Sequence, residues 1–349
     1  MVKVKKKSRK SKILLHQLSR TRAEMKRRSP QFVKKRRIRL MQRRLGILRA
    51  QEFEKRDYLP IIAPKNFSFI DNTDEMLKFI YDCQEGLRTN EKVECNLSQI
   101  DSLSSDAIAL LAACTNDRTF LGKRGKIRGN APLRPTLQKT FVESGFYNHV
   151  NASKYLKGAH KKDNNLFHQE SHFRVESDIA KKACLLGTRH VFGNERPFED
   201  LFEMLVESMS NTNNHAANQQ KDKQIKWWLY TYNDPNGNTL YTFIDLGVGI
   251  FDSVPATRFK KLKKAIGISH NVDIVADLLE GKIKSREEVD NNMRGKGIPQ
   301  IAANSKNCMF KRAYIISNDV KINLKNGLPE RLGANFLGTL LFWELGQND

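Results

Sequence analysis

Positive charge is concentrated at one end of this 349-residue chain. Residues 1–57 contain 22 of the 61 Lys and Arg residues but only four acidic residues, Glu24, Glu52, Glu54 and Asp57. Of the total net charge of +23, this segment therefore carries +18 and the rest of the chain only +5. The rest of the chain is therefore nearly neutral, and the high net charge describes an N-terminal arm and not a basic domain.

The rest of the chain is long enough and apolar enough to fold. The length predicts about two domains, and a hydrophobic content of 39% can supply their cores. The longest obvious apolar run, Ala107–Cys114, has eight residues, far fewer than the roughly 20 that a membrane helix needs. We therefore expect no membrane partner. The five cysteines lack metal or redox spacing and the basic N-terminus lacks the apolar core of a secretory signal, which favours the cytoplasm.

Two patterns divide the basic segment. Residues 1–12 are almost entirely Lys, Arg and Ser, and we expect them to be disordered. From Pro30 to Arg56, apolar residues recur at roughly helical spacing, which predicts a basic amphipathic helix. Its candidate nucleic-acid-binding residues are Arg36, Arg37, Arg39, Arg43 and Arg44. Such charge density predicts salt-sensitive binding of RNA or DNA through residues 1–56, with a solvated tail or a dock for an acidic protein as alternatives.

Residues 58–150 alternate between strand and helix patterns. This order predicts a small α/β unit with parallel strands. The expected elements are a helix at 73–87, a strand at 93–100, a helix from Asp106, a strand near 126–132 and a helix that ends near Ser144. Residues 151–170 are polar and are expected to be a linker.

Residues 171–349 combine helices with several strands, so the sequence predicts a mixed α/β (α+β) protein. The expected order is short strands near Phe173 and at 183–186, a helix at 197–218, a hairpin of 225–232 with 239–246, a mostly helical Lys-rich insert at 251–292, a Gly-rich turn and helix, a hairpin of 312–317 with 320–324, and a strand at 336–345.

Four short segments of this last region carry candidate chemistry. In the first, Glu207, Asn211, Asn214 and His215 lie at i, i+4, i+7 and i+8 of a predicted helix and share one face. An amide oxygen of Asn211 can bind Mg²⁺, and Glu207 can take a proton from an attacking water. Without the other segments, a solvated helix face is the favoured explanation of this pattern.

In the second segment, a predicted strand ends at Asp245 and continues into a turn with Gly247 and Gly249. A carboxylate at a strand end can accept a hydrogen bond from the exocyclic amine of adenine, and the glycines let a base approach the backbone. An ordinary strand-end turn is the alternative.

The third segment, Arg294-Gly295-Lys296-Gly297, is a glycine-rich turn that enters a helix. Backbone N–H groups of such a turn can point at a phosphate, and the helix dipole and the lysine add positive potential. The fourth segment has a glycine and Thr339 at the start of the last strand, where a plain core strand is the alternative.

In this order, the four segments resemble the N box, G1 box, G2 box and terminal Gly-Thr of the GHKL superfamily, which includes gyrase, chaperone, histidine kinase and mismatch-repair ATPases. The resemblance covers about residues 171–349 and implies a Bergerat-type α/β sandwich that binds Mg-ATP under a lid at 251–293. It implies that Glu207 activates water, Asn211 binds Mg²⁺ and Asp245 reads adenine. Further contacts to the nucleotide would come from Asn214, His215, Gly247, Gly249, Arg294, Gly295, Lys296, Gly297 and Thr339.

Within this superfamily, the spacing of Glu207, Asn211 and His215 is similar to that of the anti-sigma-factor kinases. No histidine is followed by an acid, as in a histidine kinase, and only ten residues follow Thr339, too few for a transducer domain. The preceding domain resembles a STAS domain, in which Ser105 takes the position of the phosphorylated serine. Its neighbours depart from the family pattern, which favours a helix N-cap by Ser104 or Ser105 instead.

These observations lead to one expected function and two alternatives. The expected function is a cytoplasmic Mg-ATP-binding GHKL-type ATPase whose nucleotide state switches a STAS-like module, with a basic arm that binds nucleic acid. The first alternative is a serine/threonine kinase that acts on a protein partner. The second is a non-hydrolysing, ATP-gated regulatory or defence-system module. A protein partner, or a second copy in a homodimer, remains open for the STAS-like domain.

Overall fold

The structure is a computed structural model that describes residues 16, 18–20, 30–55, 57–122, 125–152, 165–171, 175–215, 225–253, 270–283 and 297–347. The chain divides into two units, Met1–Asp57 and Tyr58–Asp349. The first unit contains the helix α2, and the second contains the sheets and the remaining helices named below.

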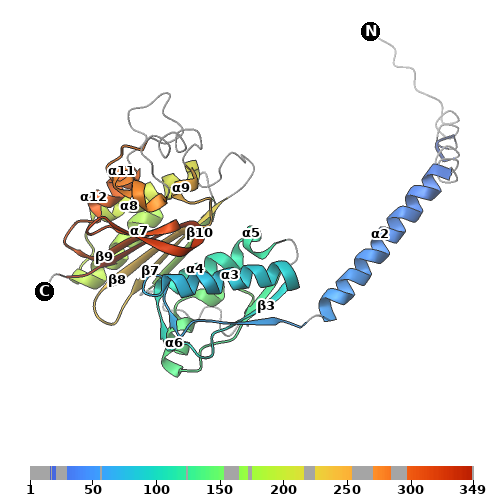
Figure 1. Cartoon of the computed structure of the whole chain (residues 1–349), viewed down its shortest axis with the longest axis horizontal. Coiled ribbons are helices and arrows are strands. Elements are labelled where there is room, and N and C mark those ends of the chain that lie inside the picture. Colours follow the sequence, from blue (N-terminus) through green and yellow to red (C-terminus); the bar gives the residue numbers. More distant parts are fainter. Residues whose placement is uncertain are drawn as a thin grey trace, which may run out of the picture. The chain divides into compact units, whose positions relative to one another are not determined.

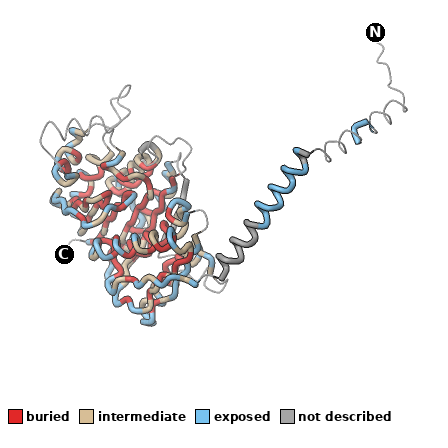
Figure 2. Tube along the Cα trace, turned by 45° about the vertical axis from the view of Figure 1, so that its right-hand side comes forward, coloured by how far each residue is buried: buried red, intermediate tan, exposed pale blue. Residues whose placement is uncertain are grey.

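Helix α2 (Pro30–Lys55) confirms the helix predicted from Pro30, a residue favoured in a first helical turn. Its apolar residues Val33, Ile38, Leu40 and Met41 are between 47% and 67% exposed, as the pale tube in Figure 2 shows. Since a helix turns about 100° per residue, Leu40 lies on the side opposite Ile38, and α2 is less amphipathic than the spacing predicted. No helix in the described part of the chain is long and apolar enough to span a membrane.

A small sheet forms the first part of the second unit. Strands β1 (Leu59–Ile62), β3 (Lys92–Asn96) and β5 (Lys126–Gly129) lie in the order β1-β3-β5, and both pairings are parallel. The predicted parallel pairing is therefore confirmed. Helix α3 (Thr73–Asn90) and helix α4 (Ser105–Asn116) connect these strands, and α4 is buried from Ser105 to Cys114. Shorter elements are β2 (Asn66–Phe67), β4 (Ser102–Leu103), α5 (Arg118–Leu121), α6 (Pro135–Glu143) and η1 (Phe146–Asn148).

A larger, antiparallel sheet forms the second part. Its strands are β6 (Asn165–Ser171), β7 (Lys226–Asn233), β8 (Thr239–Asp245), β9 (Phe310–Asn323) and β10 (Leu328–Leu345), in the order β6-β7-β8-β10-β9. The predicted hairpin of β7 and β8 is confirmed. The protein is thus of the mixed α/β class, with one parallel and one antiparallel sheet of three or more strands. The helices here are α7 (Ser177–Phe192), α8 (Glu199–His215), α9 (Ile250–Ser253), η2 (Asn271–Ile274), α11 (Val275–Leu279) and α12 (Gly297–Asn304).

Both faces of the large sheet are covered (Figure 1). On β7, Trp227 and Leu229 belong to the hydrophobic core that contains α7, α8 and α12. Trp228 and Tyr230, on the opposite face, belong to the core that contains α3 and α4. Since successive side chains of a strand point to opposite faces, a strand covered on both sides has a continuous apolar run. This explains the apolar run from Trp227 to Tyr230 in β7.

Polar contacts also join helix α4 to the large sheet through the loop before α3. The buried carboxylate of Asp106, in the first turn of α4, accepts hydrogen bonds from the backbone N–H groups of Phe69 (2.6 Å) and Ile70 (3.1 Å). The carbonyl oxygen of Ile70 in turn accepts a hydrogen bond from Lys321 Nζ on β9 (2.7 Å). The loop that contains Phe69 and Ile70 is therefore held by α4 on one side and by the large sheet on the other.

The prediction of a strand at residues 183–186 is wrong, because this segment lies within helix α7. Its buried face consists mainly of Ala180, Ala183, Cys184, Gly187 and Val191. These residues recur three or four positions apart, which is helical spacing. The apolar run at 183–186 is too short to show this periodicity when it is considered without its neighbours.

The expected linker at 151–170 ends in strand β6, which pairs antiparallel with β7. As an edge strand, β6 has only one neighbouring strand, so it can form from a polar sequence. Residues 153–164 and the strand expected near Phe173 lie outside the described residues.

The prediction of a hairpin within residues 312–324 is also wrong. Strand β9 runs from Phe310 to Asn323 without a turn, and the chain reverses instead between Asn323 and Leu328. Asn318 has a positive φ of 52°, and the pairing with β10 shifts register there. Asparagine tolerates this conformation, so a bulge stands where the sequence suggested a turn. Of the expected insert at 251–292, only residues 251–253 and 270–283 are described.

Replacing Asp106 with alanine should lower the free energy of unfolding by about 2–6 kcal/mol, because two buried N–H groups lose their acceptor at about 1–3 kcal/mol each. Urea denaturation measures this change. Asp106→Asn keeps one oxygen acceptor, so its free energy of unfolding should fall by less than that of Asp106→Ala. Equal stability of Asp106→Ala and the unchanged protein would mean that this carboxylate does not hold the loop.

Candidate functional site

Asp245 is the last residue of β8 and is only 6% exposed. Its Oδ1 atom accepts a hydrogen bond from the Gly247 N–H (3.0 Å), and its Oδ2 atom accepts one from Thr212 Oγ1 on α8 (3.2 Å). Burial raises the pKa of this carboxyl group to about 6, although both hydrogen bonds oppose the change. The group is therefore mostly ionised at neutral pH, and its oxygens retain lone pairs for a further donor.

A cavity of about 70 Å³ lies against Asp245. Its lining includes Ser208 and Asn211 from α8, Phe243 and Asp245 from β8, Gly249 from the following turn, and Thr339 from β10. Thr339 lies directly opposite Asp245 in the pairing of β8 with β10. The fold thus brings together Asn211, Asp245, Gly249 and Thr339, four of the residues that the sequence singled out.

Asn211 presents an amide with an unsatisfied group. Its Nδ2 atom is buried and has no hydrogen-bond partner in the described part of the chain. The backbone of Gly297 lies so close that a Cβ atom there would be 2.7 Å from Asn211 Oδ1. Because a half-turn of the side chain exchanges the amide oxygen and nitrogen, Asn211 can offer either an acceptor or a donor to a ligand.

These features fit a magnesium ion that is held mainly by its substrate. An Asn oxygen is a suitable Mg²⁺ ligand. Among the described residues, no group of three or more His, Cys, Asp or Glu side chains could hold a metal ion. The remaining ligands of an ion at Asn211 would therefore be water and phosphate oxygens, an arrangement that Mg²⁺ favours.

Glu207 lies one helical turn before Asn211 on α8 and is half-buried, but it does not line the cavity. Burial raises the pKa of its carboxyl group, and the nearby negative charge of Glu203 adds to this effect. Glu203 itself accepts hydrogen bonds from Gln300 (3.2 Å) and Asn304 (2.9 Å) of α12. A higher pKa makes Glu207 a stronger base for water than an exposed glutamate.

The glycine turn after β8 is held by a residue that the sequence analysis missed. Gly249 has a φ of 82°, and a Cβ atom there would collide with the amide of Asn318. Asn318 Oδ1 accepts a hydrogen bond from the Phe251 N–H (3.1 Å), and its Nδ2 atom donates to the Val248 oxygen (3.0 Å) and to Asp252 Oδ2 (2.9 Å). The signal for this role was an asparagine in the middle of an apolar strand.

Ser317 and Thr212 were also missed. Ser317 Oγ accepts a hydrogen bond from the Ile250 N–H (2.8 Å), donates one to the Gly338 oxygen (2.8 Å), and lies 3.4 Å from Thr339 Oγ1. It thus links the turn after β8 to β10. Thr212 follows Asn211 on α8, and only the folded structure brings its hydroxyl to Asp245.

The remaining predicted site residues differ in how far the structure describes them. Gly247 is buried, and Gly297 is the first residue of α12. The side chains of Asn214 and His215 and all of Arg294, Gly295 and Lys296 lie outside the described residues.

The N-cap residue of α4 is one of the two serines that the sequence predicted. Ser104 is the N-cap residue, but its side chain makes no capping hydrogen bond and instead donates to the Phe67 oxygen (3.3 Å). Ser105 is only 5% exposed, and its Oγ atom has no partner in the described part of the chain. A phosphate on Ser105 would therefore have to displace the packing around it.

No protein-family model matches this chain, and a search of curated proteins also gives no match. The functional interpretation of the site therefore depends on its geometry and chemistry.

Replacing Thr212 with valine should raise the pKa of Asp245 further above about 6, because the lost hydroxyl stabilises the ionised carboxylate. Carboxyl carbon NMR across a pH titration measures the midpoint. Thr242→Val is the matched control. Thr242 lies on β8, the strand of Asp245, and its buried hydroxyl has no hydrogen-bond partner in the described part of the chain. Identical midpoints for both variants would rule out this role of Thr212.

Proposed function

We propose that Tyr58–Asp349 binds Mg-ATP at a site that includes the cavity between α8, β8 and β10, and that its architecture is related to the Bergerat-type sandwich of the GHKL superfamily. The observation that carries this proposal is the convergence of Asn211, Asp245 and Thr339, from three separate elements, on one cavity. The order of these elements along the chain supports the same resemblance, since a helix with Glu207 and Asn211 precedes a strand that ends in Asp-x-Gly-x-Gly.

The adenine would bind at the end of β8. The Asp245 carboxylate, ionised at neutral pH, accepts a hydrogen bond from the exocyclic amine. Phe243 and Leu341 line the cavity and offer apolar surface to the ring. Gly249 also lines the cavity, and its missing Cβ atom leaves room for the amide of Asn318, which holds the turn. Thr339, next to Asp245 across the sheet, offers a hydroxyl to the same ligand.

The phosphates would lie toward Asn211 and Gly297. Gly297 is the first residue of α12, and the positive end of a helix dipole favours anions. Mg²⁺ bound at Asn211 would supply charge neutralisation to the phosphate oxygens. Glu207 is positioned on the same helix to accept a proton from an attacking water, and its raised pKa suits that role.

The second core of the large sheet offers a route from the nucleotide to the STAS-like module. Leu246 follows Asp245 and packs against the core that contains α3 and α4. It also lines a cavity of about 340 Å³ together with Leu77 of α3, Phe120 of α5 and Phe336 of β10. A shift of the backbone at Asp245 on nucleotide binding would therefore move a side chain that contacts this module.

The burial of Ser105 favours a nucleotide-driven switch over a phosphorylation switch within the chain. A kinase needs its acceptor hydroxyl exposed to the nucleotide, whereas Ser105 lies in the buried first turn of α4. A serine/threonine kinase would thus have to act on a separate protein.

Asp245→Ala should weaken ATP binding by about 10- to 100-fold, because an unpaired polar group costs about 1–3 kcal/mol. Glu207→Gln should retain binding and lower phosphate release by about 10²- to 10⁴-fold. Calorimetric titration and a phosphate-release assay measure the two effects, and Glu199→Gln, an exposed position on the same helix, is the control. Absence of saturable ATP or ADP binding by the folded protein would refute the proposal, and unchanged turnover in Glu207→Gln would remove this residue as the base.

We also propose that α2 binds nucleic acid. Within α2 the basic residues outnumber the acidic ones, Glu52 and Glu54, and the first turn contains no acid. The arginines in its described, exposed stretch are Arg36, Arg37, Arg39, Arg43 and Arg44. Exposed charges of this density displace counterions from a phosphate backbone, which gives affinity with little sequence preference.

Changing these five arginines to glutamine should flatten the salt dependence of binding to single-stranded RNA or duplex DNA. Each phosphate contact contributes about 0.7–0.9 to the slope of log K against log salt, so the slope should fall by up to about 4. Fluorescence anisotropy at several salt concentrations measures it. The matched five lysine substitutions keep the charge and should keep the slope. Equal slopes for the glutamine variant and the unchanged protein would place the nucleic-acid site elsewhere.

A further inference from the structure

A cavity of about 340 Å³ lies between α3, α5, β10 and the residue that follows β8. We call it the Leu246 cavity after one of its lining residues. Its volume falls within the range of about 300–1,000 Å³ that is typical of sites for small organic ligands. None of its lining residues belongs to the cavity at Asp245.

The walls of the Leu246 cavity are mainly apolar. One wall is a single face of α3, because its residues recur three or four positions apart: Leu77, Ile80, Tyr81 and Gln84. Phe120 of α5 and Phe336 of β10, which are both buried, add two rings from other parts of the chain. Three separate elements thus form a surface that can take up the hydrocarbon body of a ligand.

Charge is almost absent from this lining. Among the described residues that form it there is no Lys, Arg or His, and Asp117 is the one acidic residue. The Asp117 carboxylate already accepts a hydrogen bond from the Phe120 N–H (2.7 Å) at the start of α5. Gln84 and Thr119 add an amide and a hydroxyl. Because burying an unpaired charge costs much free energy, an uncharged ligand fits this cavity better than an ion.

The Leu246 cavity and the cavity at Asp245 lie on opposite faces of the large sheet. Phe336 and Leu246 pack in the core that contains α3 and α4. Phe243 and Leu341, which line the cavity at Asp245, belong to the core that contains α7 and α8. The two cavities are therefore separated by the ends of β8 and β10 and by no other layer of the fold.

These cavities share a short stretch of backbone. Asp245 lines one cavity, and Leu246, the next residue, lines the other. On β10, Gly338 lies between Leu337, which lines the Leu246 cavity, and Thr339, which lines the cavity at Asp245. The backbone of Gly338 is so close that a Cβ atom there would be 2.3 Å from the Asp245 carbonyl oxygen. A ligand in one cavity would thus contact backbone that also forms the other.

We propose that the Leu246 cavity binds a small uncharged molecule with an aromatic or aliphatic body, and that this ligand tightens nucleotide binding at Asp245. The second part rests on the proposed function. Leu246 is only partly buried, and a ligand packed against it would hold the peptide that joins it to Asp245. Nucleotide binding would then have less backbone to order, which gives positive coupling without a new contact.

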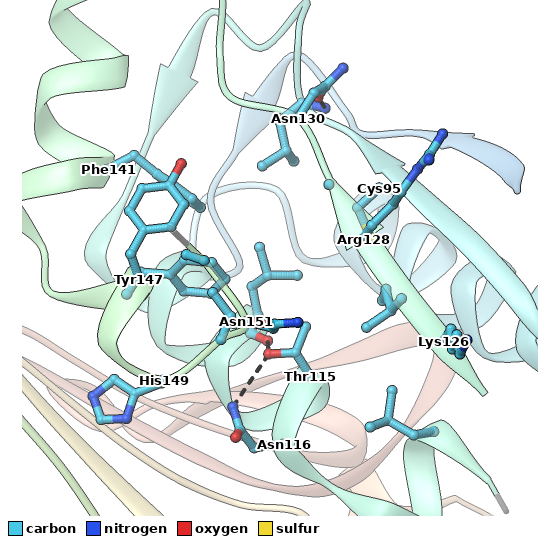
Figure 3. A pocket seen from close by; sticks show the side chains of 18 of the residues that line it. Cys95, Thr115, Asn116, Lys126, Arg128, Asn130, Phe141, Tyr147, His149 and Asn151 are labelled. Atoms are coloured by element: carbon cyan, nitrogen blue, oxygen red, sulfur yellow. Dashed lines mark hydrogen bonds between the residues drawn. The ribbon is translucent and has the colours of Figure 1, made fainter. Parts of the chain in front are cut away.

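A larger cavity, of about 620 Å³, is the alternative position for an apolar ligand (Figure 3). It lies beside the small parallel sheet, and Phe141, Tyr147 and Asn151 are among its lining residues. None of its described lining residues is next in the chain to a residue that lines the cavity at Asp245. A ligand there would lack the shared backbone, so the experiments have to separate the two cavities.

The test of binding uses the full chain and two fluorescent probes that differ by one group. Phenylnaphthylamine is uncharged, and anilinonaphthalene sulfonate is its anionic counterpart. Phenylnaphthylamine should bind saturably with one site per chain, at least about tenfold more tightly than the sulfonate, because the lining offers the sulfonate no cation. Sulfonate binding of equal or higher affinity would overturn the proposal, and so would the absence of saturable binding of the neutral probe.

Filling variants locate the probe. Gln84→Trp and Thr119→Trp each place a ring in the Leu246 cavity and should abolish binding of phenylnaphthylamine. Asn151→Trp, the matched substitution in the larger cavity, should leave this binding unchanged. All three positions are at least partly exposed, and urea denaturation checks that the variants fold. Retained binding in either folded variant of the Leu246 cavity, or loss of binding in Asn151→Trp, would overturn the proposal.

Titrations with both ligands test the coupling. Saturating Mg-ATP should lower the dissociation constant of phenylnaphthylamine at least about fivefold, and saturating phenylnaphthylamine should lower that of Mg-ATP by the same factor. An unchanged or higher dissociation constant would overturn the coupling. If Mg-ATP does not bind at all, the nucleotide proposal fails by itself, and the probe titrations and filling variants still decide whether the Leu246 cavity binds the probe.

A matched pair of alanine variants tests the connection between the cavities. Leu246→Ala and Ile80→Ala each remove a partly buried apolar side chain from the lining, but only Leu246 adjoins Asp245. Leu246→Ala should reduce the coupling factor to about one, whereas Ile80→Ala should keep it within about twofold of its value in the unchanged protein. Equal coupling factors in the two variants would overturn the connection through Leu246.

Discussion

Burial of the large antiparallel sheet on both faces is the constraint on which the rest of the structure depends. The tryptophans Trp227 and Trp228 are adjacent in sequence, yet they belong to two separate cores. Because successive side chains of a strand point to opposite faces, the α7–α8–α12 layer and the α3–α4 layer pack on the two faces of this one sheet. The apolar parts of both layers stabilise the same five strands, so the part with the small parallel sheet and the part with the large sheet belong to one compact unit.

Polar side chains of the candidate site lie at the end of a buried strand of this sheet. Asp245 terminates β8, and its buried carboxylate is tolerated because the Gly247 N–H and the Thr212 hydroxyl both donate to it. The next residue, Leu246, already contacts the opposite core. One peptide unit thus separates the candidate site at Asp245 from the core that contains α3 and α4. The Arg312–Asp71 ion pair adds a polar link between β9 and the loop before α3.

Patterns within one segment predicted well the elements that depend on local contacts. The β7–β8 hairpin has turn formers between two apolar runs, and α2 and α8 each show helical spacing. Elements that depend on distant partners were missed. Strand β6 forms only because β7 offers an open edge, and β9 continues through Asn318 because β10 pairs with both of its halves. No single window of sequence contains that information.

The same division applies to the candidate site. The sequence by itself singled out candidate residues: Asn211 on one face of a predicted helix, Asp245 at the end of a predicted strand and Thr339 at the start of the last one. Only the tertiary structure decided that these residues share one cavity, and that Thr212, Ser317 and Asn318 hold it together. The physical reason is that hydrogen-bond partners far apart along the chain are chosen by packing of the sheet and its helices, whereas residue type and periodicity are local properties.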